Sequence, residues 1–255
     1  MIRAMYNNAK IIYEKNNHPL FPNGNVSHYF ESFSDISDEE IIPLTIIQPS
    51  EEPYLFTEYV APGYTTVEEM HSSILKRIYR PSKMVQNYLT SHLFLNSLTI
   101  PYIAMHVRWS DKIQGDSKET EFIPISHYLD SCNEIRNKTG ISTIVLCCDT
   151  YDAISEVEKQ NVHGFTILYN DEIRSKNTAV DSVVNRIHTN QLNQSELELE
   201  YLTCFVNMHI LTNAVSIVGN YDSCFCLVAI QLRNKPDCDI NVNTRKALWG
   251  IHNKF

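Results

Sequence analysis

Glycine is scarce in this sequence: it has seven glycines in 255 residues, and they lie far apart. A Walker-type phosphate loop or a G-x-G-x-x-G fingerprint needs glycines within about six or seven residues of one another. The sequence therefore excludes both of these phosphate-binding motifs, and any nucleotide would have to be held in another way.

Positive charge and long apolar runs are scarce as well. Lys and Arg total 21 against 30 Asp and Glu, a net charge of −9, which argues against a protein whose main task is to hold a nucleic-acid backbone. No apolar run approaches the roughly 18 residues of a membrane helix, and the first residues lack the apolar stretch of a signal peptide. The seven cysteines form no C-x-x-C pair. The composition therefore predicts a soluble, reduced, cytoplasmic protein.

What is present, over roughly residues 98–235, is a regular alternation of strands and helices. Short apolar runs rich in β-branched residues predict four strands: Tyr102–Trp109, Ser142–Cys148, Gly164–Tyr169 and Ala214–Gly219. The predicted helices between and after them are Pro124–Lys138, ending at Gly140; Leu197–Leu211, after an S-x-x-E capping box at Ser195 and Glu198; and a helix from Asp222 and Ser223 to about Arg233. This alternation indicates a parallel sheet covered on both faces, hence a Rossmann-like three-layer α/β domain.

The first hundred residues are less regular. Their predicted elements are two strands, Ala9–Glu14 and Val26–Phe33, around a turn at Asn23-Gly24; a third apolar run, Ile41–Ile47; a helix to Tyr79 after a capping box at Thr66 and Glu69; and a helix from Pro81 to about Leu95. This portion is too short for a complete second α/β domain. We therefore divide the chain into a reduced α+β portion with connecting helices, residues 1–97, and the Rossmann-like domain, residues 98–255.

Polar side chains follow three of the predicted strands. The first strand leads into Arg108, Ser110, Asp111 and Lys112, the second into Asp149, and the fourth into Asn220, Tyr221, Asp222 and Ser223 at a helix N-terminus. Because ligands of open parallel sheets bind beyond the carboxyl ends of the strands, these three exits should line one site. His106 and Arg108 alternate along their strand and share a face. A cation beside a helix N-terminus predicts an anion site that fits a diphosphate.

These residues resemble a family. His106-Val107-Arg108-Trp109-Ser110-Asp111-Lys112 looks like the H-V-R-R-T-D-K signature of the α1,6-fucosyltransferases, which include the enzymes of N-glycan core fucosylation and their rhizobial relatives. Further segments resemble that family in the same order: Arg77–Pro81, Phe122–Tyr128, Val145–Asp149 and Leu211–Ile230. The resemblance covers about residues 75–235, and more weakly Ala9–Phe33.

The resemblance implies the nucleotide-sugar-binding half of a GT-B glycosyltransferase. Such an enzyme moves fucose from GDP-fucose to a glycan acceptor with inversion, without a metal or other cofactor. In this family the first Arg of the signature holds the donor β-phosphate, a role that falls to Arg108. Lys112 and a following carboxylate would activate the acceptor. Glu119 stands in the family's place for that carboxylate, with Glu121 and Asp116 as possible substitutes.

The resemblance also implies a set of donor-binding residues. Asp149 would support Arg108 or a ribose hydroxyl, and His106 would contact the purine base. The complete expected set is His106, Arg108, Trp109, Asp111, Tyr128, Asp149, Asn207, Tyr221, Asp222, Ser223 and Cys224, with no metal ligand.

Several positions depart from the family's pattern. The second signature Arg is Trp109 here, which removes one diphosphate cation, and the family's Gln after the second Ser is Cys224. The Asp that reads guanine is Asn207 here. An amide offers one acceptor and one donor where guanine needs two acceptors, so selectivity should weaken. The family's secretory anchor and most of its amino-terminal domain find no counterpart, so a second copy or a partner chain could be needed to replace that domain.

Two alternatives to an active transferase remain open at this point. The first is a catalytically degenerate nucleotide-sugar-binding subunit or assembly partner, which would bind GDP without transfer. The second is a metal-dependent GT-A transferase that uses Asp237-Cys238-Asp239 as a D-x-D motif.

Overall fold

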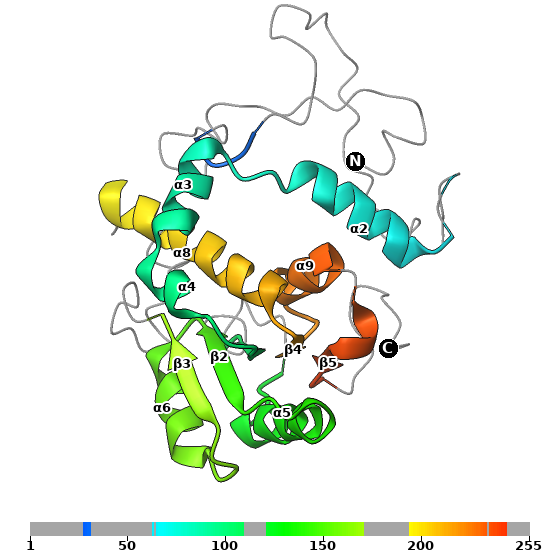
Figure 1. Ribbon diagram of the computed structural model, residues 1–255, viewed down its shortest axis with the longest axis vertical. Helices are drawn as coiled ribbons and strands as arrows, with labels where there is room; N and C mark the ends of the chain where they lie inside the picture. Colours follow the sequence, from blue (N-terminus) through cyan, green and yellow to red (C-terminus); the bar gives the residue numbers. More distant parts are fainter. Residues whose placement is uncertain are drawn as a thin grey trace, which may run out of the picture.

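The protein is built on a five-stranded, all-parallel sheet (Figure 1). The computed structural model describes residues 28–31, 63, 65–109, 121–170, 194–233 and 235–243. The strands are β1 (Ile103–Val107), β2 (Thr143–Cys148), β3 (Thr166–Tyr169), β4 (Ser216–Gly219) and β5 (Ile240–Asn241), in the order β3-β2-β1-β4-β5. The predicted α/β class and parallel sheet are confirmed, and β5 is an addition.

Helices cover both faces of this sheet. They are α2 (Val67–Ile78), α3 (Lys83–Ser91), α4 (Leu93–Ser97), α5 (Ile125–Thr139), α6 (Tyr151–Gln160), α8 (Gln194–Asn213) and α9 (Cys224–Arg233), with a 3₁₀ turn, η4 (Pro236–Cys238). One face packs on α5 and α6, and the other on α8 and α9. None of the described helices is both long and apolar enough to cross a membrane.

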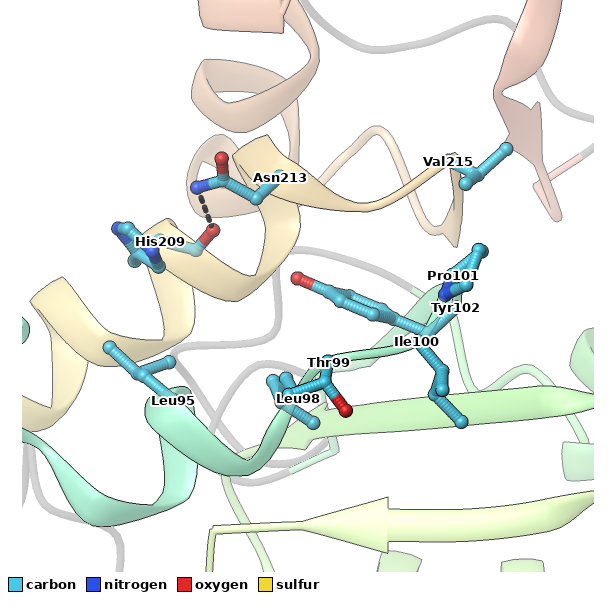
Figure 2. A pocket seen from close by; sticks show the side chains of 9 residues that line it. All are labelled: Leu95, Leu98, Thr99, Ile100, Pro101, Tyr102, His209, Asn213 and Val215. Carbon is cyan, nitrogen blue, oxygen red and sulfur yellow. Dashed lines mark hydrogen bonds between the residues drawn. The ribbon is translucent and has the colours of Figure 1, made fainter.

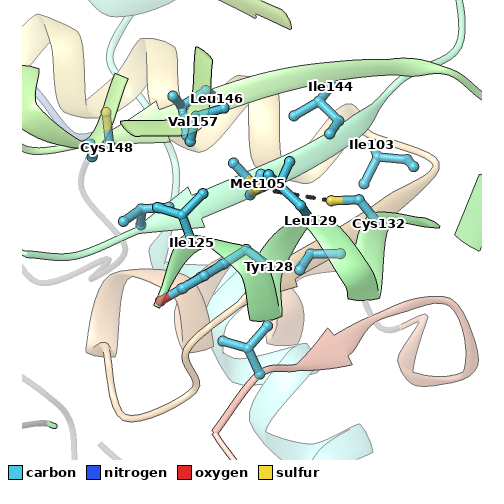
Figure 3. Packing of buried hydrophobic residues seen from close by; sticks show 14 of the residues in the cluster. Ile103, Met105, Ile125, Tyr128, Leu129, Cys132, Ile144, Leu146, Cys148 and Val157 are labelled. Carbon is cyan, nitrogen blue, oxygen red and sulfur yellow. Dashed lines mark hydrogen bonds between the residues drawn. The ribbon is translucent and has the colours of Figure 1, made fainter. Parts of the chain in front are cut away.

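Strand alternation divides the core into two apolar clusters. Ile103, Met105 and Val107 of β1 face α5 and α6, where Leu129 and Val157 meet them (Figure 3). The intervening β1 residues face the other cluster, which is filled from α8 and α9. All five residues of β1 are buried, as expected of a central strand covered on both faces.

Local signals explain most helix boundaries. Pro124 precedes α5, and Gly140 ends it with a left-handed φ of 78°. Thr66 caps α2 by accepting from the Glu69 N–H at 3.0 Å, while the Glu69 carboxylate reaches back to the Thr65 N–H at 2.9 Å. The capping box predicted at Thr66 and Glu69 is therefore present, with its return bond shifted by one residue.

Two other expectations need correction. The helix expected from Pro81 to Leu95 begins after a Ser82 cap and is interrupted at His92, which separates α3 from α4. Ser195 lies inside α8 and does not cap it, because the helix already includes Gln194. Glu198 instead meets the ring of His28 at 3.2 Å.

Little of the amino-terminal portion falls in the described residues. Ala9–Glu14, Asn23-Gly24 and Ile41–Ile47 lie outside them, and of Val26–Phe33 the structure describes residues 28–31. Phe30 forms an isolated antiparallel bridge with Pro81. In addition, α2 packs on α9 and α3 on α8, so the described part of residues 1–97 rests on the Rossmann-like domain.

Candidate functional site

The strand order places a topological switch point between β1 and β4. From β1 the chain proceeds outward through β2 to β3, and it then returns to the other side of β1 as β4. His106 pairs in register with Gly219 on β4 and with Cys147 on β2. The polar exits of β1, β2 and β4 therefore meet at one edge, which is where open α/β sheets bind ligands.

Arg108 is held at this edge by Asp149. A guanidinium N–H of Arg108 donates to one carboxylate oxygen of Asp149, and the backbone N–H of Trp109 donates to the other at 2.9 Å. The two side chains are 21% and 17% exposed, so the ion pair stands at the surface of the site and is not sealed in the core. Asp149 thus fixes the direction of the Arg108 side chain.

His106 lies beside the start of α9. Its side chain is buried, and its ring stacks on that of Phe225 with centroids 5.6 Å apart and planes 25° apart. A Cβ on Gly219 would overlap the thiol of Cys226 and would lie 3.4 Å from the His106 Cβ. Glycine is needed here because β4 and α9 approach so closely.

The turn from β4 into α9 is braced by Asn241, at the end of β5, and by Asn243 just after it. The Tyr221 N–H donates to the Asn241 side chain at 3.2 Å, and the Asn243 amide donates to the Asp222 carboxylate. Ser223 caps the helix, since its carbonyl accepts from the Leu227 N–H at 3.0 Å. Sequence reasoning missed Asn241 and Asn243, because the only local signal is an N-x-N pattern about 20 residues away from the turn.

The Asp222 carboxylate puts a negative charge of the protein itself at the N-terminus of α9. Asp222 and Ser223 are each 9% exposed. Carboxylates are favoured at helix N-termini, so this placement stabilises the turn, but it also adds a like charge beside any bound diphosphate. Cys224, the first residue of α9, is exposed.

Helix α8 closes the site from above β1 and β2. The Asn207 carbonyl lies 3.9 Å from the Cys147 thiol of β2, and the Asn207 side-chain oxygen is buried with no hydrogen bond from the described residues. Cys204, three residues earlier on α8, is exposed, and its thiol lies within electrostatic reach of Arg108. One turn of α8 therefore carries an amide oxygen with no described hydrogen-bond partner and a thiol that senses the Arg108 charge.

Two expected donor-binding residues lie on the other face of the sheet. Trp109 and Tyr128 belong to the cluster between the sheet and α5. Figure 3 shows Tyr128 there. The Trp109 indole N–H donates to the Ile123 carbonyl at 3.3 Å. Burial raises the pKa of Tyr128, with Asp149 adding to the effect. Trp109 and Tyr128 thus pack on the α5 face of the sheet, opposite the face on which His106 stacks against α9.

The expected acceptor-activating residues cannot be placed beside Arg108. Ser110, Asp111, Lys112, Asp116 and Glu119 all lie outside the described residues. Glu121 is described and exposed, directly before Phe122. The roles given to Lys112 and Glu119 therefore stay predictions.

The alternative in which Asp237-Cys238-Asp239 serves as a metal-binding D-x-D motif is contradicted at Asp239. This carboxylate forms an ion pair with Arg233 at 2.6 Å and accepts from the Ile217 N–H at 2.8 Å, with both side chains at most 1% exposed. A metal-bound nucleotide could not reach a carboxylate so fully enclosed. Asp239 instead ties β5 to the start of β4, and Asp237 lies exposed in η4.

A pocket of about 290 Å³ lies at the opposite edge of the sheet, between α4, the end of α8 and the start of β1 (Figure 2). Its lining combines apolar side chains, such as Leu95, Leu98 and Val215, with the polar groups of His209 and Asn213. Burial lowers the pKa of His209, which favours its neutral form. Among the described residues, no Lys or Arg lines this pocket to hold a diphosphate, unlike the edge at Arg108.

The chain matches no family model and no curated protein. Among solved structures it is similar to POFUT1 in complex with GDP-fucose, with 14% identity over 69% of this chain and 47% of that chain at a TM-score of 0.39. It is similar to NodZ alpha-1,6-fucosyltransferase soaked with GDP-fucose, with 16% identity over 65% and 47% at 0.39. It is also similar to a mutant of Arabidopsis thaliana FUT1 in complex with GDP, with 13% identity over 65% of this chain and 35% of that chain at a TM-score of 0.40. The chain thus spans about half the length of the first two structures, or less.

Proposed function

We propose that this chain is a fucosyltransferase-like glycosyltransferase that binds GDP-fucose at the carboxyl edge of its sheet. The observation that carries the proposal is the Arg108–Asp149 pair at the switch point, on the face shared with His106 and the start of α9. A guanidinium held in place by a carboxylate is preorganised to bind a diphosphate. We infer fucose as the sugar and GDP as the nucleotide from the resemblance of His106–Lys112 to the family signature.

The proposed reaction is an inverting transfer that needs no metal. An acceptor hydroxyl attacks the anomeric carbon of fucose, the bond from that carbon to the diphosphate breaks, and GDP leaves with the electron pair. Negative charge grows on the leaving diphosphate, so Arg108 stabilises the transition state more than the ground state. The acceptor proton passes to a carboxylate, for which Glu119 is the first candidate, with Lys112 beside it.

Arg108→Ala should abolish measurable GDP binding, since truncating one partner of a fixed charge pair costs about 2–5 kcal/mol, or roughly 30-fold to several thousand-fold in affinity. Isothermal titration calorimetry with GDP measures this. Lys138→Ala is the matched control, because it removes one exposed cation from the last turn of α5, away from the site. Unchanged GDP affinity in folded Arg108→Ala protein would refute the site.

A second candidate, a nucleotide-sugar-binding subunit without catalysis, is favoured by two observations. Trp109 replaces a signature cation and turns its side chain to the α5 face, and the Asp222 carboxylate stands at the N-terminus of α9. Both weaken the field that would stabilise a leaving diphosphate. Release of GDP from GDP-fucose, measured with and without glycan acceptors, separates the two: the subunit binds GDP and releases none from the donor.

A further inference from the structure

An exposed aromatic ring stands beside the Arg108 edge and has no role in the mechanism above. Phe122 is 54% exposed, and its ring lies against that of Trp109, with centroids 4.9 Å apart and planes tilted by 36°. Trp109 itself is buried, at 8% exposed. Phe122 therefore presents an aromatic surface to solvent while a second ring supports it from behind.

The ring pair is joined rigidly to the site. The Trp109 indole N–H donates to the carbonyl of Ile123, the residue after Phe122, and the Trp109 backbone N–H donates to the Asp149 carboxylate that also holds Arg108. Ile123 is buried, at 7% exposed. Phe122 is thus positioned by the same carboxylate as the diphosphate-binding cation, so the two surfaces keep a fixed relation.

The position of Phe122 separates it from the donor nucleotide. His106 stacks on Phe225 of α9 and Arg108 lies within electrostatic reach of Cys204 on α8, whereas Trp109 belongs to the cluster against α5. Such alternation is expected of successive strand residues. Phe122 leads into α5 and packs on Trp109, so it flanks the end of β1 on the side opposite the predicted base. A ligand on Phe122 would therefore lie against Trp109, the residue that follows Arg108 in the chain, on the side away from His106.

Exposed polar residues lie close to Phe122 along the chain. Glu121 precedes it, and Ser126 and His127 are exposed in the first turn of α5. An aromatic surface rimmed by polar groups suits a ligand that is apolar on one face and polar at its edges. A pyranose ring has this character, since its axial C–H groups stack on the electron-rich face of an aromatic ring while its hydroxyls reach polar neighbours.

We propose that Phe122, supported by Trp109, stacks against a pyranose ring of the acceptor glycan and so forms an acceptor subsite. This inference rests on the proposed function and adds the residue that receives the acceptor. It also gives Trp109 a role at a position where the family resemblance would place a cation.

Saturation-transfer NMR with methyl glycosides of glucose, galactose, mannose and N-acetylglucosamine tests this proposal on the full chain. Saturating GDP is added first, so that no probe occupies the donor site. We expect at least one glycoside to receive saturation, strongest at the axial protons of one ring face. Phe122→Ala should weaken its binding about tenfold, and Phe122→Tyr should retain it, with GDP affinity the same in both variants.

Val162→Ala serves as the control, since it trims a side chain that is 86% exposed in the turn after α6. If no glycoside receives saturation while GDP binds, or if Phe122→Ala binds the glycoside as well as the unchanged protein does, the acceptor subsite is overturned and the donor site stands. If GDP itself fails to bind, the proposed function is contradicted, and the acceptor subsite that rests on it is contradicted with it. Retention in Phe122→Tyr shows that a loss in Phe122→Ala comes from the ring and not from misfolding.

Discussion

At the scale of single residues, the site depends on side chains that serve two neighbours at once. The Asp149 carboxylate accepts from the Arg108 guanidinium and from the Trp109 backbone N–H. The Asn241 side chain likewise accepts from the N–H groups of Tyr221 and Asn243. Each of these acceptors fixes a loop whose own hydrogen bonds would not hold it, because loops lack the regular pairing of strands and helices.

Asn207 carries the prediction at this scale. Asn207→Asp should raise the preference for GDP over ADP and UDP about tenfold, because a carboxylate can accept from both guanine N–H donors where an amide accepts from one. Calorimetric competition among the three diphosphates measures the ranking. Asn213→Asp makes the same change at the exposed end of the same helix and should leave the ranking as it is. An unaltered ranking in Asn207→Asp would show that Asn207 does not face the base.

At the scale of elements, the site depends on how closely β4 approaches α9. Gly219 is in contact with Cys226 and His106, and the latter stacks on Phe225. The stacking of His106 and the position of the α9 N-terminus therefore both follow from one small residue. This constraint is steric, because no φ outside the ordinary range is involved at Gly219.

Gly219→Ala should destabilise the fold by about 1–3 kcal/mol, the usual cost of overpacking a close contact. Adding Cys226→Ala removes the thiol that the new methyl group meets, so the double variant should recover part of the loss. Urea unfolding of the two single variants and the double variant measures the coupling. Additivity within about 0.5 kcal/mol would mean that the methyl group and the thiol do not meet.

At the scale of the whole molecule, the strand order determines where the site lies. The switch point between β1 and β4 gathers residues from β1, β2, β4, α8 and α9. Further elements brace it: β5 through Asn241, and the buried Arg233–Asp239 pair that joins α9 to β5. A ligand at this edge would contact these elements directly or through the residues that brace them.

GDP should therefore stabilise the entire chain. At a free concentration 100 times its dissociation constant, GDP should add about 2.7 kcal/mol to the free energy of unfolding, provided that only the folded chain binds it. Denaturant unfolding with and without GDP measures the gain. EDTA should leave it unchanged, and Arg108→Ala should remove it. A gain that disappears with EDTA and returns with manganese would contradict binding without a metal.

Local signals were enough to predict four strands and the helices α5, α8 and α9, whereas α6 was not predicted. The apolar runs at β1, β2, β3 and β4 and the boundaries at Pro124 and Gly140 depend on residues only a few positions apart. The capping signal at Ser195 was misleading, because α8 begins before that residue. Carrying the strand alternation of His106 and Arg108 one residue further would have placed Trp109 on the opposite face, which the signature alone obscured.

The contacts that make the site lie beyond the reach of such patterns. Arg108 and Asp149 are 41 positions apart, and Tyr221 and Asn241 are 20 apart. Neither pair follows from periodicity or capping, since each requires particular strands to become neighbours. β5 shows the same limit, because a two-residue strand has no apolar run of its own and forms only against β4. The amino-acid sequence alone specified which residues could bind an anion or form a strand or a helix. The packing of the folded chain decided which of them become neighbours, because that depends on burying both faces of one sheet.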